Sequence, residues 1–315
     1  MNSNEPILAV PAPWKLKGTV YFLSFWTNKT SSAKGEENDG LPTVAYSPLE
    51  AVSPFANPAM SGEHLGGLSQ IQIIRYTDSP VGPYDELIIC PGYFAYEKDD
   101  GKGRTRKRKN ARITRIYVSQ KHTCWNGRAN WNIPKHLARF EWDHSLDGKT
   151  GVRVYPYANE APNDDSYSAT SESEPSKKLF FQATFKPVHW APAFPLSFSW
   201  LKYVGIDASL VQPPLPDGRQ SSSWGGEELP GTSRWCKVIP GLSTRRATLG
   251  WMDMSQDSHD GTHDGGGGVI KSGKGYDAVY DNFWPGLRRW NVAVKMENTD
   301  IDFGEGLYWD RPKSE

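Results

Sequence analysis

Lys135 has the sequence surroundings of a reactive amine. It lies in the segment 132–142, NIPKHLARFEW, for which the spacing of the apolar residues predicts a short helix. These apolar residues recur at i, i+4 and i+7: Ile133, Leu137 and Phe140. Pro134 suits the first turn of such a helix, and Asn132 suits its cap. Lys135 would then lie at a helix N-terminus among apolar neighbours, and both features lower the pKa of a lysine.

A lysine with a lowered pKa supplies a neutral amine, which can attack the carbonyl carbon of a ketone. The alternative interpretation is a lysine that points into water from an exposed first turn. Spacing alone leaves both interpretations open.

Other motifs carry weaker indications of chemistry. The basic run 102–109 is either a nuclear signal or phosphate-binding patch, or a solvated hairpin loop between two strands. The glycines 265–268, followed by Lys271, lack the spacing of a phosphate loop and indicate a linker. His259 and His263 would share one face of a helix, but the glycines around them oppose a helix. We therefore expect no metal and no organic cofactor.

The rest of the chain reads mainly as strands. Short runs rich in β-branched and aromatic residues, separated by Gly and Pro, predict a mainly β, antiparallel architecture with few short helices. The predicted strands are 19–26, 69–76, 86–90, 111–119, 152–157, 178–185 and 288–296. The protein should therefore hold its reactive side chains on a β scaffold.

Composition places the chain among folded globular proteins. Its 315 residues include 39 aromatics, which supply a core, and 54 Gly and Pro residues, which mark long loops. We expect one domain spanning residues 1–315. The expected loop insertions lie near 97–110, 159–178, 212–234 and 255–275.

Charge and targeting signals limit the expected classes of partner and the expected location of the protein. Lys and Arg balance Asp and Glu at 36 each, which argues against nucleic acid or a membrane surface as partner. The three cysteines indicate no disulfide framework, and the sequence predicts neither a secretory signal nor a transmembrane helix. We expect a cytoplasmic protein, with the nucleus as rival location, and the sequence leaves a homo-oligomer open.

Residues 127–137, GRANWNIPKHL, resemble the G-R-E-x-x-x-x-P-K-K-L motif of the acetoacetate decarboxylase superfamily. The upstream segment 80–86, PVGPYDE, is similar to a family segment that ends in a functional glutamate. The order of strand, Y-x-E segment, strand and G-R…P-K motif also agrees. The resemblance covers about residues 14–205 and is looser in the C-terminal third.

The resemblance implies a cone-shaped closed β-barrel with an internal cavity that contains the lysine. Lys135 would be the nucleophile that forms a Schiff base with a β-keto acid, and Glu86 would be the acid/base or orienting carboxylate. Arg128 would hold the loop or a substrate carboxylate. His136 stands where the family has a second lysine, and Ala129 where it has a glutamate.

These two departures favour a substrate other than acetoacetate. An aromatic wall would suit a larger, more apolar small-molecule carbonyl substrate, and we predict Trp125, Trp131 and Tyr84 as its binding residues. The alternative is that the tryptophans belong to the core. The resemblance thus favours a role in specialised metabolism of the fungal type.

We expect a lyase of the acetoacetate decarboxylase type that acts on a β-keto acid or polyketide-like carbonyl compound by decarboxylation or by aldol and dehydration steps. A first alternative is a cyclase, pericyclase or isomerase that uses the cavity without covalency, with Glu86, Arg128 or His136 polarising a carbonyl. A second alternative is a non-enzymatic carrier of small hydrophobic molecules.

Overall fold

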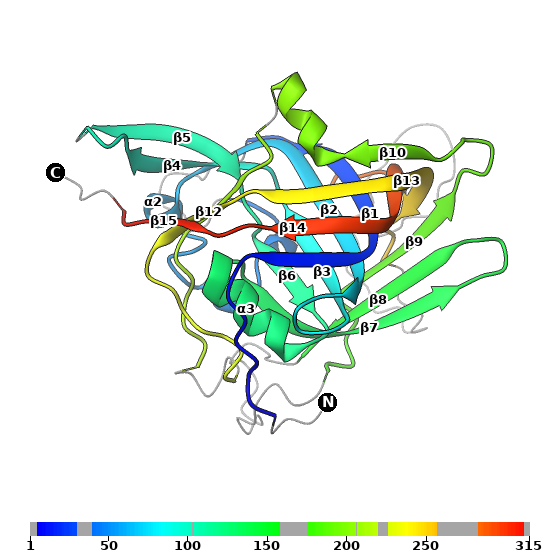
Figure 1. Ribbon diagram of the computed structural model, residues 1–315, viewed down its shortest axis with the longest axis horizontal. Helices are drawn as coiled ribbons and strands as arrows, with labels where there is room; N and C mark the ends of the chain where they lie inside the picture. The colour runs from blue at the N-terminus through cyan, green and yellow to red at the C-terminus, as the bar shows by residue number, and fades with distance from the viewer. Residues whose placement is uncertain are drawn as a thin grey trace, which may run out of the picture.

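Nine strands of the computed structural model pair edge to edge and close into a β-barrel (Figure 1). Around the ring they are β1 (Trp14–Thr27), β14 (Trp290–Phe303), β13 (Pro240–Asp253), β9 (Phe181–Pro187), β8 (Thr150–Pro156), β7 (Lys135–His144), β6 (Arg115–Val118), β3 (Tyr84–Cys90) and β2 (His64–Asp78). The pairing of β1 with β2 closes the ring, and β6 runs parallel to β7. The prediction of a mainly β fold around a closed barrel is confirmed.

The structure describes residues 5–29, 40–102, 104–157, 175–205, 207–219, 226–256 and 283–311. The loops expected at 159–178 and 255–275 lie mostly outside these ranges, as do His259, His263 and the glycine run 265–268. Residues 213–219 and 226–234 carry neither helix nor strand.

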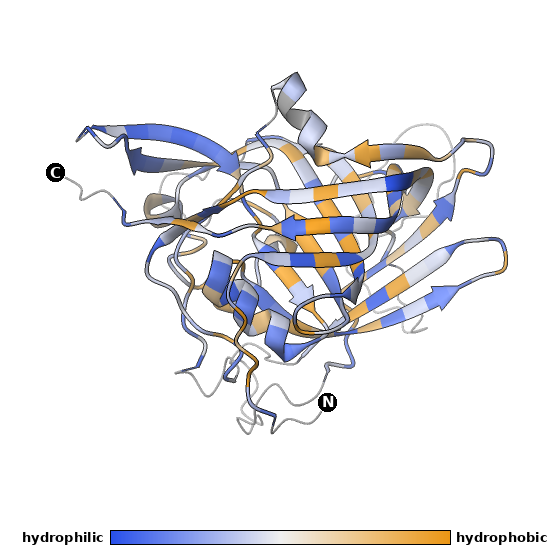
Figure 2. Cartoon of the chain, in the orientation of Figure 1, coloured by the Kyte–Doolittle hydropathy of each residue, from blue (hydrophilic) through white to orange (hydrophobic). Residues whose placement is uncertain are grey.

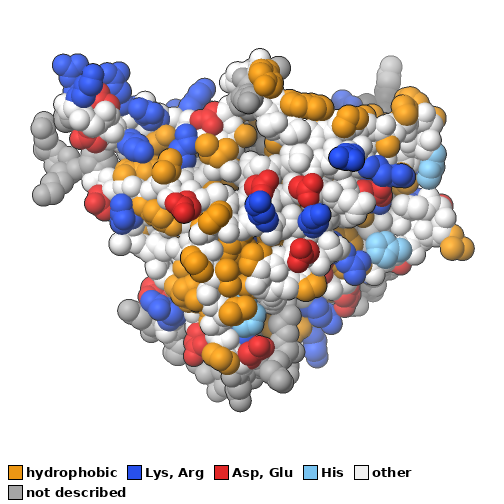
Figure 3. All heavy atoms as spheres, in the orientation of Figure 1, with side chains coloured by type: hydrophobic (Ala, Val, Ile, Leu, Met, Phe, Trp, Pro, Cys, Tyr) orange, Lys and Arg blue, Asp and Glu red, His pale blue; other side chains and the backbone are white. Residues whose placement is uncertain are grey.

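A second set of strands extends from one end of β2. It consists of β4 (Tyr93–Asp99), β5 (Thr105–Ala111), β11 (Leu210–Gln212), β12 (Trp235–Val238) and β15 (Leu307–Trp309). The basic run 102–109, interpreted as a loop, instead contributes the turn and most of the second strand of the β4–β5 hairpin. This hairpin projects from the barrel, and its Lys and Arg side chains are exposed at its tip (Figure 3).

The helices are short and lie outside the barrel wall. They are α1 (Pro48–Ala51), α2 (Pro58–Ser61), α3 (Lys121–Trp131) and the 3₁₀ turns η1 (Thr43–Ala45) and η2 (Phe198–Val204). The remaining strand, β10 (Phe194–Ser197), pairs with β13.

The prediction of a helix over residues 132–142 is wrong. The helix is α3, which ends at Trp131, and the strand β7 begins at Lys135. Asn132 follows α3 with a φ of 55°, so this residue caps the C-terminus of a helix rather than the N-terminus. The backbone N–H of Asn132 accordingly donates to the carbonyl of Arg128.

Alternation along the strands sorts the apolar residues into two cores. On β2, Ile74 and Tyr76 pack into one cluster, whereas Ile71 and Ile73 pack into the other, because successive side chains point to opposite faces of a sheet. The apolar stretches run across neighbouring strands (Figure 2). The cluster that contains Tyr76 also contains the cavities described below.

Candidate active site

Lys135 is buried at the start of β7, with its amine held between a carboxylate and a hydroxyl. Nζ lies 2.7 Å from Oε2 of Glu86 and 2.9 Å from Oγ1 of Thr123. Lys135 is 5% exposed and Glu86 is 2% exposed. Strand β3 supplies Glu86, and helix α3 supplies Thr123. The two residues predicted as nucleophile and acid/base are therefore in direct contact.

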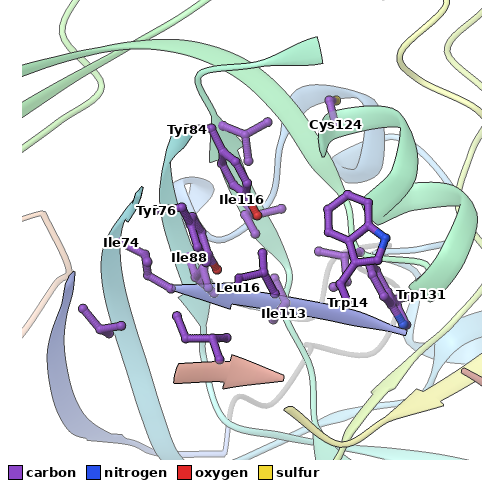
Figure 4. Close-up of a cluster of buried hydrophobic side chains, with 14 of the residues drawn as sticks. Trp14, Leu16, Ile74, Tyr76, Tyr84, Ile88, Ile113, Ile116, Cys124 and Trp131 are labelled. Carbon is purple, nitrogen blue, oxygen red and sulfur yellow. The ribbon is translucent and has the colours of Figure 1, made fainter. Parts of the chain in front are cut away.

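Two tyrosines extend this contact into a ring of hydrogen bonds. The hydroxyl of Tyr76 donates to Oε1 of Glu86 at 3.0 Å. The hydroxyl of Tyr84 is hydrogen-bonded to those of Tyr76 and Thr123. The two tyrosine rings are stacked with centroids 4.3 Å apart (Figure 4). The polar groups around the amine thus form a closed circuit of potential proton transfers.

The ion pair reverses the pKa direction expected from the sequence. Burial by itself lowers the pKa of Lys135, but the charge of Glu86, aided by Tyr84, outweighs burial and raises that pKa above its ordinary value. Lys135 itself begins a strand rather than a helix, and its amine contacts Thr123 in the first turn of α3. The raised pKa favours the ammonium form of Lys135 beside Glu86.

The tyrosines in the circuit remain protonated over the physiological range. Burial raises the pKa of Tyr84 to about 12, although the Lys135 ammonium opposes this rise. Burial and the nearby Glu86 raise the pKa of Tyr76 well above its ordinary value. Both phenols can therefore donate hydrogen bonds.

Gly127 leaves room for the lysine side chain. A Cβ at this position of α3 would lie 2.5 Å from Cδ and 2.6 Å from Cε of Lys135. Because real Cβ atoms do not approach so closely, an alanine here would displace the aliphatic part of Lys135 or the helix. The steric fit with the Lys135 side chain thus explains why the first residue of the G-R pair is a glycine here.

Arg128 and His136 lie away from the lysine amine. Each binds Glu50 of α1: Nη1 of Arg128 lies 2.9 Å from Oε1, and Nε2 of His136 lies 2.7 Å from Oε2. Lys135 and His136 are consecutive residues of a strand, so their side chains point to opposite faces. The structure does not bring the predicted catalytic residues Arg128 and His136 to the amine.

The cluster of Glu50, Arg128 and His136 instead ties helix α1 to α3 and β7. Burial alone would raise the pKa of Glu50, but His136 and Arg128 outweigh burial and lower it. The guanidinium of Arg128 also donates to carbonyls of three segments: those of Pro230, Pro216 and Lys135. The donors of Arg128 thus bind Glu50 and carbonyls of the chain, an arrangement that ties loops together.

Of the three aromatics predicted to bind substrate, two line the cavity at Lys135. Trp131 and Tyr84 both face this space, and Trp131 packs edge-on against Trp14 at 5.4 Å (Figure 4). Trp125 is half-buried on α3 and lines neither of the cavities described here.

Two adjoining cavities lie within the apolar cluster that contains Tyr76. The inner one, of about 10 Å³, reaches Lys135 and Glu86. The outer one, of about 70 Å³, lies farther along β2. Four side chains line both cavities and so form their common wall: Tyr76, Ile88, Ile113 and Phe303. The outer cavity therefore adjoins the space beside the amine through these side chains.

Sequence reasoning missed three residues that complete the site: Tyr76, Thr123 and Glu50. Tyr76 carried a usable signal, since it alternates with Gln72 and Ile74 along a predicted strand. Thr123 and Glu50 stand in short helices that the sequence did not predict, so no local pattern pointed to them.

No protein-family model and no curated protein sequence matches this chain. Among solved structures, acetoacetate decarboxylase from Legionella pneumophila subsp. pneumophila str. Philadelphia 1 is 11% identical with a TM-score of 0.49, and the match covers 99% of this chain and 94% of that one. Another structure, from structural studies of acetoacetate decarboxylase, is 13% identical with a TM-score of 0.51, covering 97% and 93%. The match with the TM-score of 0.51 shows that the chain has the acetoacetate decarboxylase-like fold, as the resemblance predicted.

None of the described helices is long and apolar enough to cross a membrane. Within the described ranges, no three His, Cys, Asp or Glu side chains are grouped so that they could hold a metal ion.

Proposed function

We propose that this protein is a lysine-dependent lyase that forms an imine between Lys135 and a β-keto acid or polyketide-like carbonyl compound. The observation that carries the proposal is the buried contact of Nζ with Glu86 and Thr123 beside an internal cavity. The fold supports this proposal only at the level of the fold class, because the structure of acetoacetate decarboxylase that it matches is 13% identical.

The reaction begins with transfer of one proton from Nζ to Oε2 of Glu86 across 2.7 Å. This transfer neutralises both partners, which a site closed to water favours. The free amine attacks the carbonyl carbon, and the carbonyl oxygen leaves as water after taking up two protons. The product is a protonated imine bound to Lys135.

The imine then acts as an electron sink. When the bond between Cα and its leaving group breaks, its electrons form the C=C bond of an enamine and the π electrons of the C=N bond move onto nitrogen; this releases carbon dioxide from a β-keto acid or a carbonyl fragment from a β-hydroxy ketone. A proton adds to Cα of the resulting enamine, and water hydrolyses the imine to return Lys135. Glu86 and the phenol of Tyr76 stand where they can supply and accept these protons.

A non-covalent cyclase or isomerase is the second candidate, and a carrier is the third. The raised pKa of Lys135 favours both, since a paired ammonium is a poor nucleophile but a good hydrogen-bond donor to a carbonyl. The outer cavity, lined mostly by apolar side chains, would hold a hydrophobic ligand in either case.

Reductive trapping distinguishes these candidates. The protein is incubated with decan-2-one and sodium cyanoborohydride, and the mass gain is measured on the intact protein. The lyase proposal predicts one added alkyl group in the wild type and none in Lys135→Met. The control is Lys186→Met, which removes an exposed lysine and should leave trapping unchanged.

Absence of an adduct in the wild type would refute imine formation. An equal adduct in Lys135→Met would assign the reaction to another lysine and refute the role of Lys135. Ligand binding without any adduct in the wild type would favour the cyclase or the carrier.

A further inference from the structure

The outer cavity extends the site along strand β2. Because alternate residues of a strand share one face, the strand presents Leu68, Gln70, Gln72, Ile74 and Tyr76 in turn to this space. Tyr76 lies at the inner end, where it contacts Glu86. At a rise of about 3.3 Å per residue, Gln72 lies ~13 Å and Gln70 ~20 Å along the strand from Tyr76. The lining of the two cavities therefore extends in one direction away from the amine.

The wall of the outer cavity is mostly apolar. Besides the residues of β2, it contains Ile88, Ile113, Leu210, Leu242, Ile301 and Phe303. Its volume of about 70 Å³ is below the range of about 300–1,000 Å³ usual for ligand pockets, so an elongated ligand would enter only as the side chains of the wall move apart. An alkyl or polyketide-like chain would find apolar contacts along most of its length.

The described residues that line the two cavities include no unpaired cation that could bind the carboxylate of a substrate. Among the described residues that line either cavity, Lys135 is the sole cation, and Glu86 already neutralises it. At the exposed rim, Asp207 is an anion paired with Lys237 at 3.8 Å: burial would raise its pKa, but hydrogen bonds from Ser209 and Asn110 and the charge of Lys237 outweigh burial and lower it. A substrate carboxylate would thus lose water without gaining a counter-charge.

Gln70 and Gln72 are the neutral polar groups of the wall. Nε2 of Gln72 donates to Oε1 of Gln70 at 3.0 Å. This bond leaves the acceptor oxygen of Gln72 and the amino group of Gln70 without a partner among the described residues. The pair offers a hydrogen-bond acceptor and a donor to the cavity, which together match a hydroxyl or another neutral polar group.

We propose that the site takes a neutral, elongated carbonyl compound whose apolar chain fills the outer cavity and whose distal hydroxyl-like group binds Gln70 and Gln72. This inference rests on the proposed function, since it assumes that the carbonyl end reaches Lys135. It narrows the substrate class away from β-keto acids. The bond weakened by the imine is then a carbon–carbon bond to a hydroxylated carbon, and the β-hydroxyl loses its proton as an aldehyde departs.

Three ten-carbon methyl ketones that differ at one end test the proposal: decan-2-one, 10-hydroxydecan-2-one and 9-oxodecanoate. Each is trapped on the wild-type protein with cyanoborohydride, and initial trapping rates at subsaturating ketone are compared. We expect 10-hydroxydecan-2-one to be trapped about threefold or more faster than decan-2-one, because its hydroxyl gains a hydrogen bond. We expect 9-oxodecanoate to be trapped about tenfold or more slower, because its carboxylate is left unpaired.

A pair of variants assigns the preference to the wall of the cavity. Gln72→Leu should remove the preference for the hydroxyl, so that this variant traps 10-hydroxydecan-2-one no faster than decan-2-one. The matched control is Gln182→Leu on β9, whose side-chain amide donates to the carbonyl of Ser255 away from both cavities, and it should keep the preference.

The outcomes separate this proposal from the one on which it rests. Trapping of 9-oxodecanoate or acetoacetate as fast as the neutral ketones would overturn the substrate class and leave the imine chemistry intact. A hydroxyl preference that survives Gln72→Leu would overturn the assigned hydrogen bond. Failure of every ketone to label Lys135 would instead overturn the proposed function.

Discussion

Replacing Glu86 by glutamine should lower the pKa of Lys135. In the wild type, burial lowers this pKa and the adjacent carboxylate raises it. The effect of the carboxylate is larger, so the net pKa is raised. Glutamine keeps nearly the same shape but carries no charge. The lowering of the pKa by burial is then opposed only by the weaker effects of the neutral neighbours. Loss of an opposite charge within hydrogen-bond distance changes a pKa by about 1–3 pH units. We therefore expect a fall of at least about one unit.

The pH dependence of reductive trapping measures this fall. The free amine reacts, so the trapping rate of acetone should rise with pH and level off above the pKa of Lys135. In the wild type the midpoint should lie above that of an ordinary lysine, and in Glu86→Gln it should lie lower. The midpoint is the readout, because the plateau rate also reflects the lost proton acceptor.

The matched control is Glu297→Gln, which removes a carboxylate 2.7 Å from Lys295 outside the cavities. This variant should leave the midpoint unchanged. A midpoint in Glu86→Gln that equals or exceeds that of the wild type would refute the electrostatic account of the site.

The remaining predictions concern the packing around the amine. Gly127→Ala should destabilise the fold by about 1–3 kcal/mol in urea unfolding and abolish trapping, because its Cβ would overlap Lys135; a stabilised variant would contradict this packing. Glu50→Gln should lower the free energy of unfolding by about 3–5 kcal/mol, since it leaves Arg128 without its carboxylate, while the trapping midpoint stays in place. Tyr76→Phe should slow trapping with little loss of stability, and an unchanged rate would exclude Tyr76 from the proton circuit. Because the pKa of Lys135 is raised on folding, its ion pair should stabilise the protein fully below about pH 10.4 and lose this contribution as pH rises through the folded pKa; Lys135→Met should lack this alkaline loss in urea unfolding.

Much of the β architecture could be predicted because most strands carry their own local pattern. The run 69–76 alternates between faces, and the structure places it within β2. Lys135 and Glu86 could be singled out because a short motif surrounds each of them. Their contact could not be derived from spacing, since β3 and β7 meet through β6, which lies between them in the barrel.

The misplaced helix has a physical explanation. In β7 the first four residues are all buried, because the parallel pair β6 and β7 is covered on both faces, and this hides the alternation of a strand. The true helix α3 has the opposite problem: its buried face is largely polar, with Thr123, Asn126 and Arg128, so it lacks an apolar stripe. Tertiary hydrogen bonds, which sequence patterns do not report, stabilise this helix in place.

Peptide mapping after reductive trapping of decan-2-one tests the central claim most directly. The wild-type protein is incubated with decan-2-one and sodium cyanoborohydride until it carries one added alkyl group. It is then digested and analysed by mass spectrometry to locate the modified lysine. We predict that the label lies on Lys135 alone, because its amine is the one that adjoins the internal cavity among the described lysines. A label spread over surface lysines, with Lys135 unmodified, would contradict the account.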